Sequence, residues 1–254
     1  MNEVLPPAPT AAALALYGEV PVSLYTGIPN ISIPLCAVNA GRLSVPLSLS
    51  YQGGGYQVDA VASWVGLGWS LNAGGVVTRT VHGIEDDHAS KGYWATGVRE
   101  AHVLSSPTDY QGAVEAQAFY YYLRDAAQGN RDGQPDQFNF NIGGYSGRFY
   151  IERTASGALA PRLVPHQDIK IELVRSGTLL QGLVLPTPDG VRYLFGGIGL
   201  NGVTCVEKSK THIAGINCAR DYDLPIITSW YLRKIESPDG QDSINLLYET
   251  HSLR

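Results

Sequence analysis

Apolar and polar residues alternate along two runs near the start of the chain, and this period of two predicts half-buried β-strands. The first run covers residues 20–38 and the second residues 43–51, with Asn39-Ala40-Gly41 between them as the turn of a hairpin. Four prolines lie inside the runs: Pro21, Pro29, Pro34 and Pro46. Because proline cannot donate a hydrogen bond to a neighbouring strand, we expect edge or bulged strands here.

The alternation returns in the second half of the chain. Strands are expected over residues 138–142, 147–152, 169–174, 179–185, 191–195, 226–235 and 243–248. Thr187-Pro-Asp-Gly190 and Ser237-Pro-Asp-Gly240 form a weak repeat with an offset of 50 residues, and each lies between two expected strands. Proline followed by Asp-Gly favours a tight turn, so each copy predicts a hairpin.

One segment has helical spacing. Within residues 111–127 apolar residues recur at intervals of three and four, Asp109 can cap the start, and Gly129 can end the helix. Residues 82–108 are polar and irregular, which indicates a long loop. The expected fold class is therefore mainly β, with hairpin-rich antiparallel sheets in a sandwich or shell and one helix near 111–127.

Composition and charge exclude several functions. The chain of 254 residues has 18 Lys+Arg and 23 Asp+Glu, a formal net charge of −5 with no basic block, whereas nucleic-acid binding usually requires a basic surface. No stretch reaches about 18 apolar residues, so no membrane span is expected. The length suits one large domain: residues 1–19 as an extended lead-in and residues 20–254 as a single β-rich module.

The start of the chain and its cysteines bear on localisation. Residues 1–9 have no basic region or apolar run, so no signal peptide is expected, and the protein is either cytosolic or begins after a removed signal. Cys205 and Cys218 flank a glycine-containing loop and can pair if the chain is exported, with Cys36 free. The alternative is two free buried thiols. No C-x-x-C occurs, so zinc sites of the usual spacing are excluded.

A glycine-rich segment resembles a cofactor motif. Gly197-Ile-Gly-Leu-Asn-Gly202 satisfies G-x-G-x-x-G, with Asp221 about 20 residues further on. Dinucleotide binding requires a helix N-terminus directed at the pyrophosphate, but the residues that follow, 203–206, are strand-like. We therefore expect a glycine-rich turn and no cofactor.

Two acidic segments offer oxygen and nitrogen ligands. The first gathers two imidazoles and three carboxylates: His82, Glu85, Asp86, Asp87 and His88. Such a loop can hold a divalent metal, although a solvated acidic loop is the expected explanation. Asn130, Asp132 and Asp136 offer calcium-type oxygens without EF-hand spacing, and Asx-turns explain them equally well. No metal is expected.

No catalytic motif is complete. No serine lies in G-x-S-x-G, and a glycosidase pair of carboxylates is not visible in a linear sequence. Seven aromatic residues offer a platform on which a sugar can stack: Trp64, Trp69, Trp94, Tyr120, Tyr121, Tyr122 and Trp230. Such residues more often pack in cores and on sheet faces. No catalytic residue is assigned.

Four segments together resemble a known family. They are residues 21–34 (PVSLYTGIPNISIP); residues 62–75 (ASWVGLGWSLNAGG) with Thr78-Arg79; Asp132 and Pro135-Asp136 leading into Phe138-Asn-Phe140 and Gly144-Tyr-Ser-Gly-Arg-Phe149; and residues 230–240 (WYLRKIESPDG). The pattern is similar to the N-terminal region of secreted RHS/YD-repeat proteins, the type shared with the Salmonella plasmid virulence B protein and the toxin-complex B component.

This resemblance implies a large parent protein, secreted or displayed on a cell surface, whose YD repeats form a β-strand shell around a C-terminal effector. The N-terminal region would be a non-catalytic module that supplies shell, plug or docking structure, with the downstream repeats as its partner. The alternative function is a carbohydrate-binding or carbohydrate-cleaving β-sandwich, supported by the aromatic content and acidic pI.

The C-terminal residues suggest a further partner. Residues 243–249 follow the second Pro-Asp-Gly turn and are expected to form an edge strand with partly unprotected apolar side chains: Ile244, Leu246, Leu247 and Tyr248. An apolar strand edge tends to recruit another chain, so we expect self-association through this strand.

Overall fold

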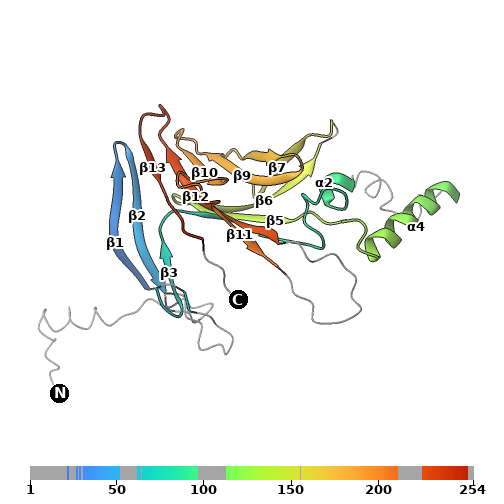
Figure 1. The fold of residues 1–254 in the computed structure, drawn as a ribbon, viewed down its shortest axis with the longest axis horizontal. Coiled ribbons are helices and arrows are strands. Elements are labelled where there is room, and N and C mark those ends of the chain that lie inside the picture. The colour runs from blue at the N-terminus through green and yellow to red at the C-terminus, as the bar shows by residue number, and fades with distance from the viewer. Residues whose placement is uncertain are drawn as a thin grey trace, which may run out of the picture. The chain divides into compact units, whose positions relative to one another are not determined.

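The computed structural model describes residues 22, 27, 29, 31–51, 62–63, 65–96, 113–154, 156–210 and 225–250. Contacts divide the chain into two compact units: Met1–Asn39 with Ser44–Gly74, and Ala40–Leu43 with Gly75–Arg254. Antiparallel strands dominate the described part of both units (Figure 1). The expectation of a mainly β fold is confirmed.

The first unit contains a three-stranded sheet in the order β1 (Ile31–Ala40), β2 (Leu43–Tyr51) and β3 (Trp69–Asn72). Gly41 and Arg42 form the turn between β1 and β2, and the backbone of Gly41 is left-handed, with φ of +54°. A glycine is favoured there because a side chain would strain that conformation. The hairpin expected in this region is present, with its turn about one residue later.

Alternation gives the paired strands β2 and β3 an apolar face and a polar face. Leu49 lies opposite Leu71, and Tyr51 opposite Trp69 with ring centroids 5.2 Å apart. On the other face Ser50 lies opposite Ser70, and their hydroxyl oxygens are 2.8 Å apart. The sequence pattern thus explains the register of these two strands.

The second unit is built on a ten-stranded antiparallel sheet in the order β7-β6-β5-β4-β12-β10-β9-β8, with β11 and β13 also paired to β12. The bounds are β4 (Val76–Thr80), β5 (Gln137–Ile142), β6 (Tyr145–Arg153), β7 (Leu159–Val164), β8 (Glu172–Ser176), β9 (Leu179–Pro186), β10 (Arg192–Gly196), β11 (Val206–Ser209), β12 (Ile226–Glu236) and β13 (Ser243–Asn245).

Strand β12 holds this sheet together because it is long enough to pair with four strands. Trp230 lies opposite both Val77 of β4 and Val206 of β11, so these two strands lie on opposite edges of β12. Lys234 likewise lies between β10 and β13. Each edge of β12 therefore accepts two strands in succession.

Large aromatic and aliphatic side chains fill the core of the second unit. The side chains that are almost fully buried include Trp230, Phe138, Phe149, Phe195, Leu183, Leu185, Leu232 and Ile151. The rings of Phe138 and Phe149 are stacked with centroids 5.0 Å apart, and Phe138 lies 5.8 Å from the ring of Trp230. These contacts join β5, β6 and β12.

Both Pro-Asp-Gly segments form hairpin turns, as expected. The amide of Gly190 donates to the carbonyl of Thr187 at 2.8 Å, between β9 and β10. The amide of Gly240 donates to the carbonyl of Ser237 at 3.0 Å, between β12 and β13. Both glycines have positive φ, which explains the residue type.

The helices agree with the sequence in one case and differ in another. Helix α4 (Ala113–Ala127) is the helix expected near 111–127. A short helix, α2 (Tyr93–Thr96), lies in a region expected to be an irregular loop. None of the helices in the described ranges has the length and apolar character needed to cross a membrane.

Strands β3, β4 and β7 were not predicted from the sequence, and for β11 only residues 203–206 were recognised as strand-like. In β4 the inward positions are Val77 and Arg79, so a charged residue interrupts the apolar alternation. In β7, Pro161 lowers the strand signal. The expected strand at 169–174 is observed at 172–176.

The C-terminal strand corrects the expectation for residues 243–248. It ends at Asn245, Ile244 is buried, and the hydroxyl of Tyr248 donates to the carbonyl of Leu232 at 2.8 Å. Leu247 is 63% exposed. The C-terminal strand is therefore shorter and better covered than the apolar pattern predicts, because its residues pair with β12 and Tyr248 bonds to Leu232 of that strand. Self-association through residues 243–249 stays a prediction.

Two glycine substitutions test the packing against Trp230. A Cβ on Gly196 would lie 2.5 Å from the Trp230 ring, whereas one on Gly202 meets open space, and both residues have positive φ. We expect Gly202→Ala to cost about 1 kcal/mol of backbone strain and Gly196→Ala about 1–3 kcal/mol more through overpacking. Urea unfolding measures the free energy of unfolding of both variants. Equal losses of stability would contradict the close packing of Gly196 against the ring of Trp230.

Candidate functional site

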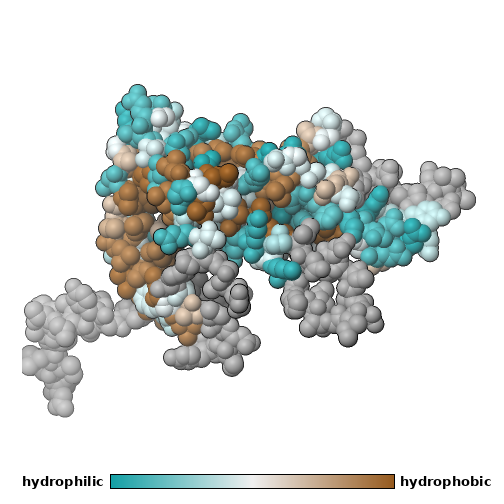
Figure 2. All heavy atoms as spheres, in the orientation of Figure 1, coloured by the Kyte–Doolittle hydropathy of each residue, from teal (hydrophilic) through white to brown (hydrophobic). Residues whose placement is uncertain are grey.

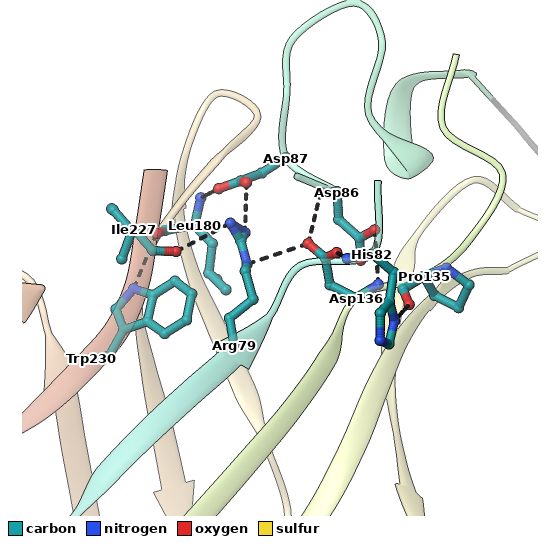
Figure 3. A network of polar contacts seen from close by, with 9 residues as sticks. All are labelled: Arg79, His82, Asp86, Asp87, Pro135, Asp136, Leu180, Ile227 and Trp230. Carbon is teal, nitrogen blue, oxygen red and sulfur yellow. Dashed lines mark hydrogen bonds and ion pairs between the residues drawn. The ribbon is translucent and has the colours of Figure 1, made fainter. Parts of the chain in front are cut away.

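Polar residues from separate parts of the chain meet around one buried cation, the guanidinium of Arg79 (Figure 3). Arg79 lies two residues after Val77 in β4, so the alternation of the strand points both side chains into the core. The Arg79 side chain is 1% exposed. A charge at this depth needs partners, because removing it from water is costly.

Two carboxylates and one carbonyl surround the guanidinium. The Nη2 atom of Arg79 donates to Oδ1 of Asp87 at 2.6 Å, and its Nε lies 3.5 Å from Oδ2 of Asp136. Its Nη1 donates to the carbonyl of Ile227 in β12 at 3.4 Å. The arginine thus joins β4 to β12 and to the segments that carry the two aspartates.

Aromatic rings complete the surroundings of this cation. The guanidinium carbon lies 5.5 Å from the ring centroid of Phe138 and 5.3 Å from that of Trp230. A cation over an aromatic face is stabilised by the ring's quadrupole, and the effect grows when water is absent. The rings therefore add to the compensation that the carboxylates provide.

Asp87 extends the network to a distant strand. Its Oδ2 accepts a hydrogen bond from the amide of Leu180 in β9 at 2.9 Å, while the carbonyl of Leu180 accepts from Nε1 of Trp230 at 3.2 Å. One carboxylate therefore fixes the acidic segment to both β4 and β9.

Asp86 and Asp136 clasp each other through their backbones. The amide of Asp86 donates to Oδ2 of Asp136 at 3.0 Å, and the amide of Asp136 donates to Oδ1 of Asp86 at 3.1 Å. The amide of His82 donates to Oδ1 of Asp136 at 2.9 Å. These reciprocal bonds join the segment after β4 to the segment that leads into β5.

Burial, together with repulsion between neighbouring carboxylates, shifts the protonation of the acidic residues in this network. Asp86, Asp87, Asp132 and Asp136 are all buried. Burial and the charge of Asp136 raise the pKa of Asp86 to about 8. Burial raises the pKa of Asp132 to about 6 and also raises that of Asp136. Burial and the charge of Asp136 therefore favour the protonated form of Asp86, whose Oδ2 atom has no hydrogen-bond partner.

The five metal candidates of the acidic loop do not converge as a ligand set. Asp86 and Asp87 turn into the Arg79 network, while Nδ1 of His82 lies 3.1 Å from the carbonyl of Pro135 and so must donate to it. Nδ1 of His88 accepts from the amide of Lys91 at 3.2 Å. Glu85 contributes its backbone carbonyl to the amide of His88. Within the described ranges no group of three or more His, Cys, Asp or Glu side chains is arranged to hold a metal ion.

The glycine-rich segment forms a loop and leads into a strand. The amide of Gly202 donates to the carbonyl of Gly199 at 3.0 Å, and Ile198 bridges to Thr204. Strand β11 follows, so the helix N-terminus required for a dinucleotide site does not occur after Gly202. Asp221 lies outside the described residues.

The cysteines divide between surface and interior. Cys36 is exposed on β1, whereas Cys205 is buried beside β11, with its sulfur 3.8 Å from the carbonyl of Val203. Cys218 lies outside the described residues, so the pairing of Cys205 with Cys218 stays a prediction.

The aromatic residues of the sugar-platform hypothesis that the structure describes differ in their exposure. Trp94 and Trp230 are buried, and Trp69 packs on Tyr51. Tyr120 and Tyr121 are exposed on α4; Tyr122 of the same helix is half-buried, and Trp64 lies outside the described residues. The two buried tryptophans serve packing and are not accessible to a sugar.

Sequence reasoning found the carboxylates but missed what unites them. Arg79 had no assigned role, and the two acidic segments, some 50 residues apart, were treated separately. The sequence signal that connects the two segments is Arg79, which lies at an inward position of a short run rich in β-branched residues. A charge buried there needs acidic partners, and the run itself contains none.

Comparison of the chain with protein-family models, curated proteins and solved structures finds no match. The geometry around Arg79 is a buried network whose polar atoms bond mainly to backbone groups and to one another, which is an arrangement suited to holding segments together.

Replacing Arg79 by methionine should strongly destabilise the fold, since Asp87 and Asp136 would remain buried without a cation. We expect a loss of about 3–5 kcal/mol for Arg79→Met. The control is Arg162→Met, which removes an exposed ion pair with Glu152 and should cost about 1 kcal/mol or less. Chemical unfolding measures the free energy of unfolding of both variants. A loss in Arg79→Met as small as that in Arg162→Met would show that the Arg79 network is dispensable.

The raised pKa of Asp86 makes stability depend on pH. A carboxyl whose pKa is higher in the folded state binds its proton more tightly there, so its contribution is full below about pH 4 and is lost as pH rises towards 8. We expect the unfolding temperature to fall between pH 5 and 9, and to fall less for Asp86→Asn. The exposed Asp168 serves as control: Asp168→Asn should retain the wild-type slope. If the unfolding temperature of Asp86→Asn fell with pH as steeply as that of the wild type, the raised pKa assigned to Asp86 would be contradicted.

Proposed function

We propose that this chain is a non-catalytic β module of a large secreted or surface-displayed protein of the RHS/YD-repeat type. In that role it supplies shell, plug or docking structure to the downstream repeats. The observation that carries the proposal is that residues from three of the four family-like segments come together in one buried cluster: Arg79, Asp136, Phe138 and Trp230.

The burial of this cluster supports a structural role. Arg79 is 5% exposed, and the other three residues are fully buried. A side chain that contacts a substrate must be reachable, whereas one that fixes strands and loops need not be. The polar residues that these segments contribute to the cluster therefore stabilise the fold, as expected of a structural module.

The hairpins support the same function. The Pro-Asp-Gly turn at Ser237 ends the longest strand, β12, and begins β13, and a similar turn at Thr187 joins β9 and β10. Repeated hairpins that add strands to one antiparallel sheet are the way in which a β-strand shell grows. Secretion or surface display belongs to this proposal.

The carbohydrate alternative receives less support. Its support was the aromatic content and the acidic pI. Of the candidate platform residues that the structure describes, Trp94 and Trp230 are buried, whereas Tyr120 and Tyr121 of α4 are exposed.

An antibody raised against this chain tests the proposal in the source organism. We expect it to detect a polypeptide much larger than 27.3 kDa, in the medium or on the cell surface, where external protease removes it from intact cells. A cytosolic enzyme detected in the same fractions is the control for lysis. A species of about 27 kDa confined to the cytosol would contradict the proposal.

A glycan array separates the alternative. We expect no saturable binding by the purified chain. Saturable binding that is lost in Tyr120→Ala, with its unfolding temperature unchanged, would favour the carbohydrate function.

A further inference from the structure

Strand β1 lies at the edge of its sheet: among the described residues it pairs only with β2, as the first strand in the order β1-β2-β3. It is ten residues long, and every residue from Ser32 to Asn39 is exposed. A long strand with an unpaired edge presents a row of free amides and carbonyls to any strand that can reach it.

This edge lacks the charges that usually protect such strands. Between residues 20 and 78 the charged residues are Arg42 and Asp59 alone, and β1 contains none. Its side chains include Ile33, Leu35 and Val38, each more than 40% exposed. Figure 2 shows hydrophobic colouring gathered over β1 and β2. Native edge strands commonly carry lysine or other charges that discourage pairing.

The turn determines which backbone groups face outward. A two-residue turn at Gly41 and Arg42 makes Ala40 and Leu43 the first hydrogen-bonded pair, so even-numbered residues of β1 direct their amides and carbonyls to β2. Odd-numbered residues direct theirs to the open edge. The proline of β1, Pro34, is even-numbered, so no proline interrupts the outward row.

We infer that β1 is an interaction edge that pairs antiparallel with β1 of a second copy of this chain, which would form a continuous six-stranded sheet. Antiparallel pairing about a two-fold axis makes a strand complementary to itself, since each donor meets an acceptor of the same segment. An uncharged strand fits an uncharged partner: no like charges oppose each other, and no ion loses its water.

Sedimentation equilibrium of the purified chain and two variants at Ala37 tests this pairing. Ala37 is odd-numbered, so Ala37→Pro removes one outward amide and places a ring in the path of the incoming strand. Ala37→Val is the matched control, because it keeps the amide and suits a strand. We expect the molecular mass of the wild type and of Ala37→Val to reach that of a dimer, twice 27.3 kDa. Ala37→Pro should need at least a tenfold higher protein concentration to form the same fraction of dimer.

A second variant guards against unfolding of the hairpin by proline. Leu35→Lys keeps every amide. Leu35 lies at the middle of β1, so pairing along the whole strand would bring the two introduced ammonium groups close together. The variant should therefore weaken the dimer, and should do so less at high salt. A wild type that stays monomeric at millimolar concentration would overturn the inference. So would an unchanged dimer in Leu35→Lys, or outward amides already protected from hydrogen exchange in the monomer.

Discussion

The second unit depends on the burial of one guanidinium. Arg79 occupies a core position of β4, and an ion of that size loses several kcal/mol of hydration there unless other groups replace the water. Asp87 and Asp136 replace it, and each brings its own segment to the core. Because Asp87 also binds the amide of Leu180, the same cation indirectly determines where the acidic segment meets β9.

This arrangement leaves an excess of acid that protons must balance. Three buried aspartates, Asp86, Asp87 and Asp136, lie close to Arg79, and the pairing of Asp86 with Asp136 places two carboxyls side by side. A proton on Asp86 relieves the repulsion and keeps its backbone bonds, since Oδ1 still accepts from the amide of Asp136. Reciprocal amide–carboxylate bonds thus connect the two chain segments, and the protonation of each carboxyl depends on the charge of the other.

The sequence predicts what depends on local pattern and misses what depends on distant compensation. Alternation located β5, β9, β10 and β12, and Pro-Asp-Gly located two turns, because period and turn chemistry act within a few residues. Strand β4 was missed because Arg79 occupies an apolar position. Its meaning appears only once Asp136, far along the chain, lies beside it. The acidic loop was likewise recognised as chemically rich, but the partner that gives Asp86 and Asp87 their role was not local.

The sheets of the two units differ in how their apolar side chains are buried. The second has a core around Trp230 and Phe138, reinforced by buried charge. In the first, as defined by its contacts, no described residue is buried, although β2 and β3 carry a continuous apolar face with Leu49 and Leu71. A three-stranded sheet gains stability when such a face is covered. The apolar face and uncharged edge of this sheet are the surfaces on which another chain or segment would add most to its stability.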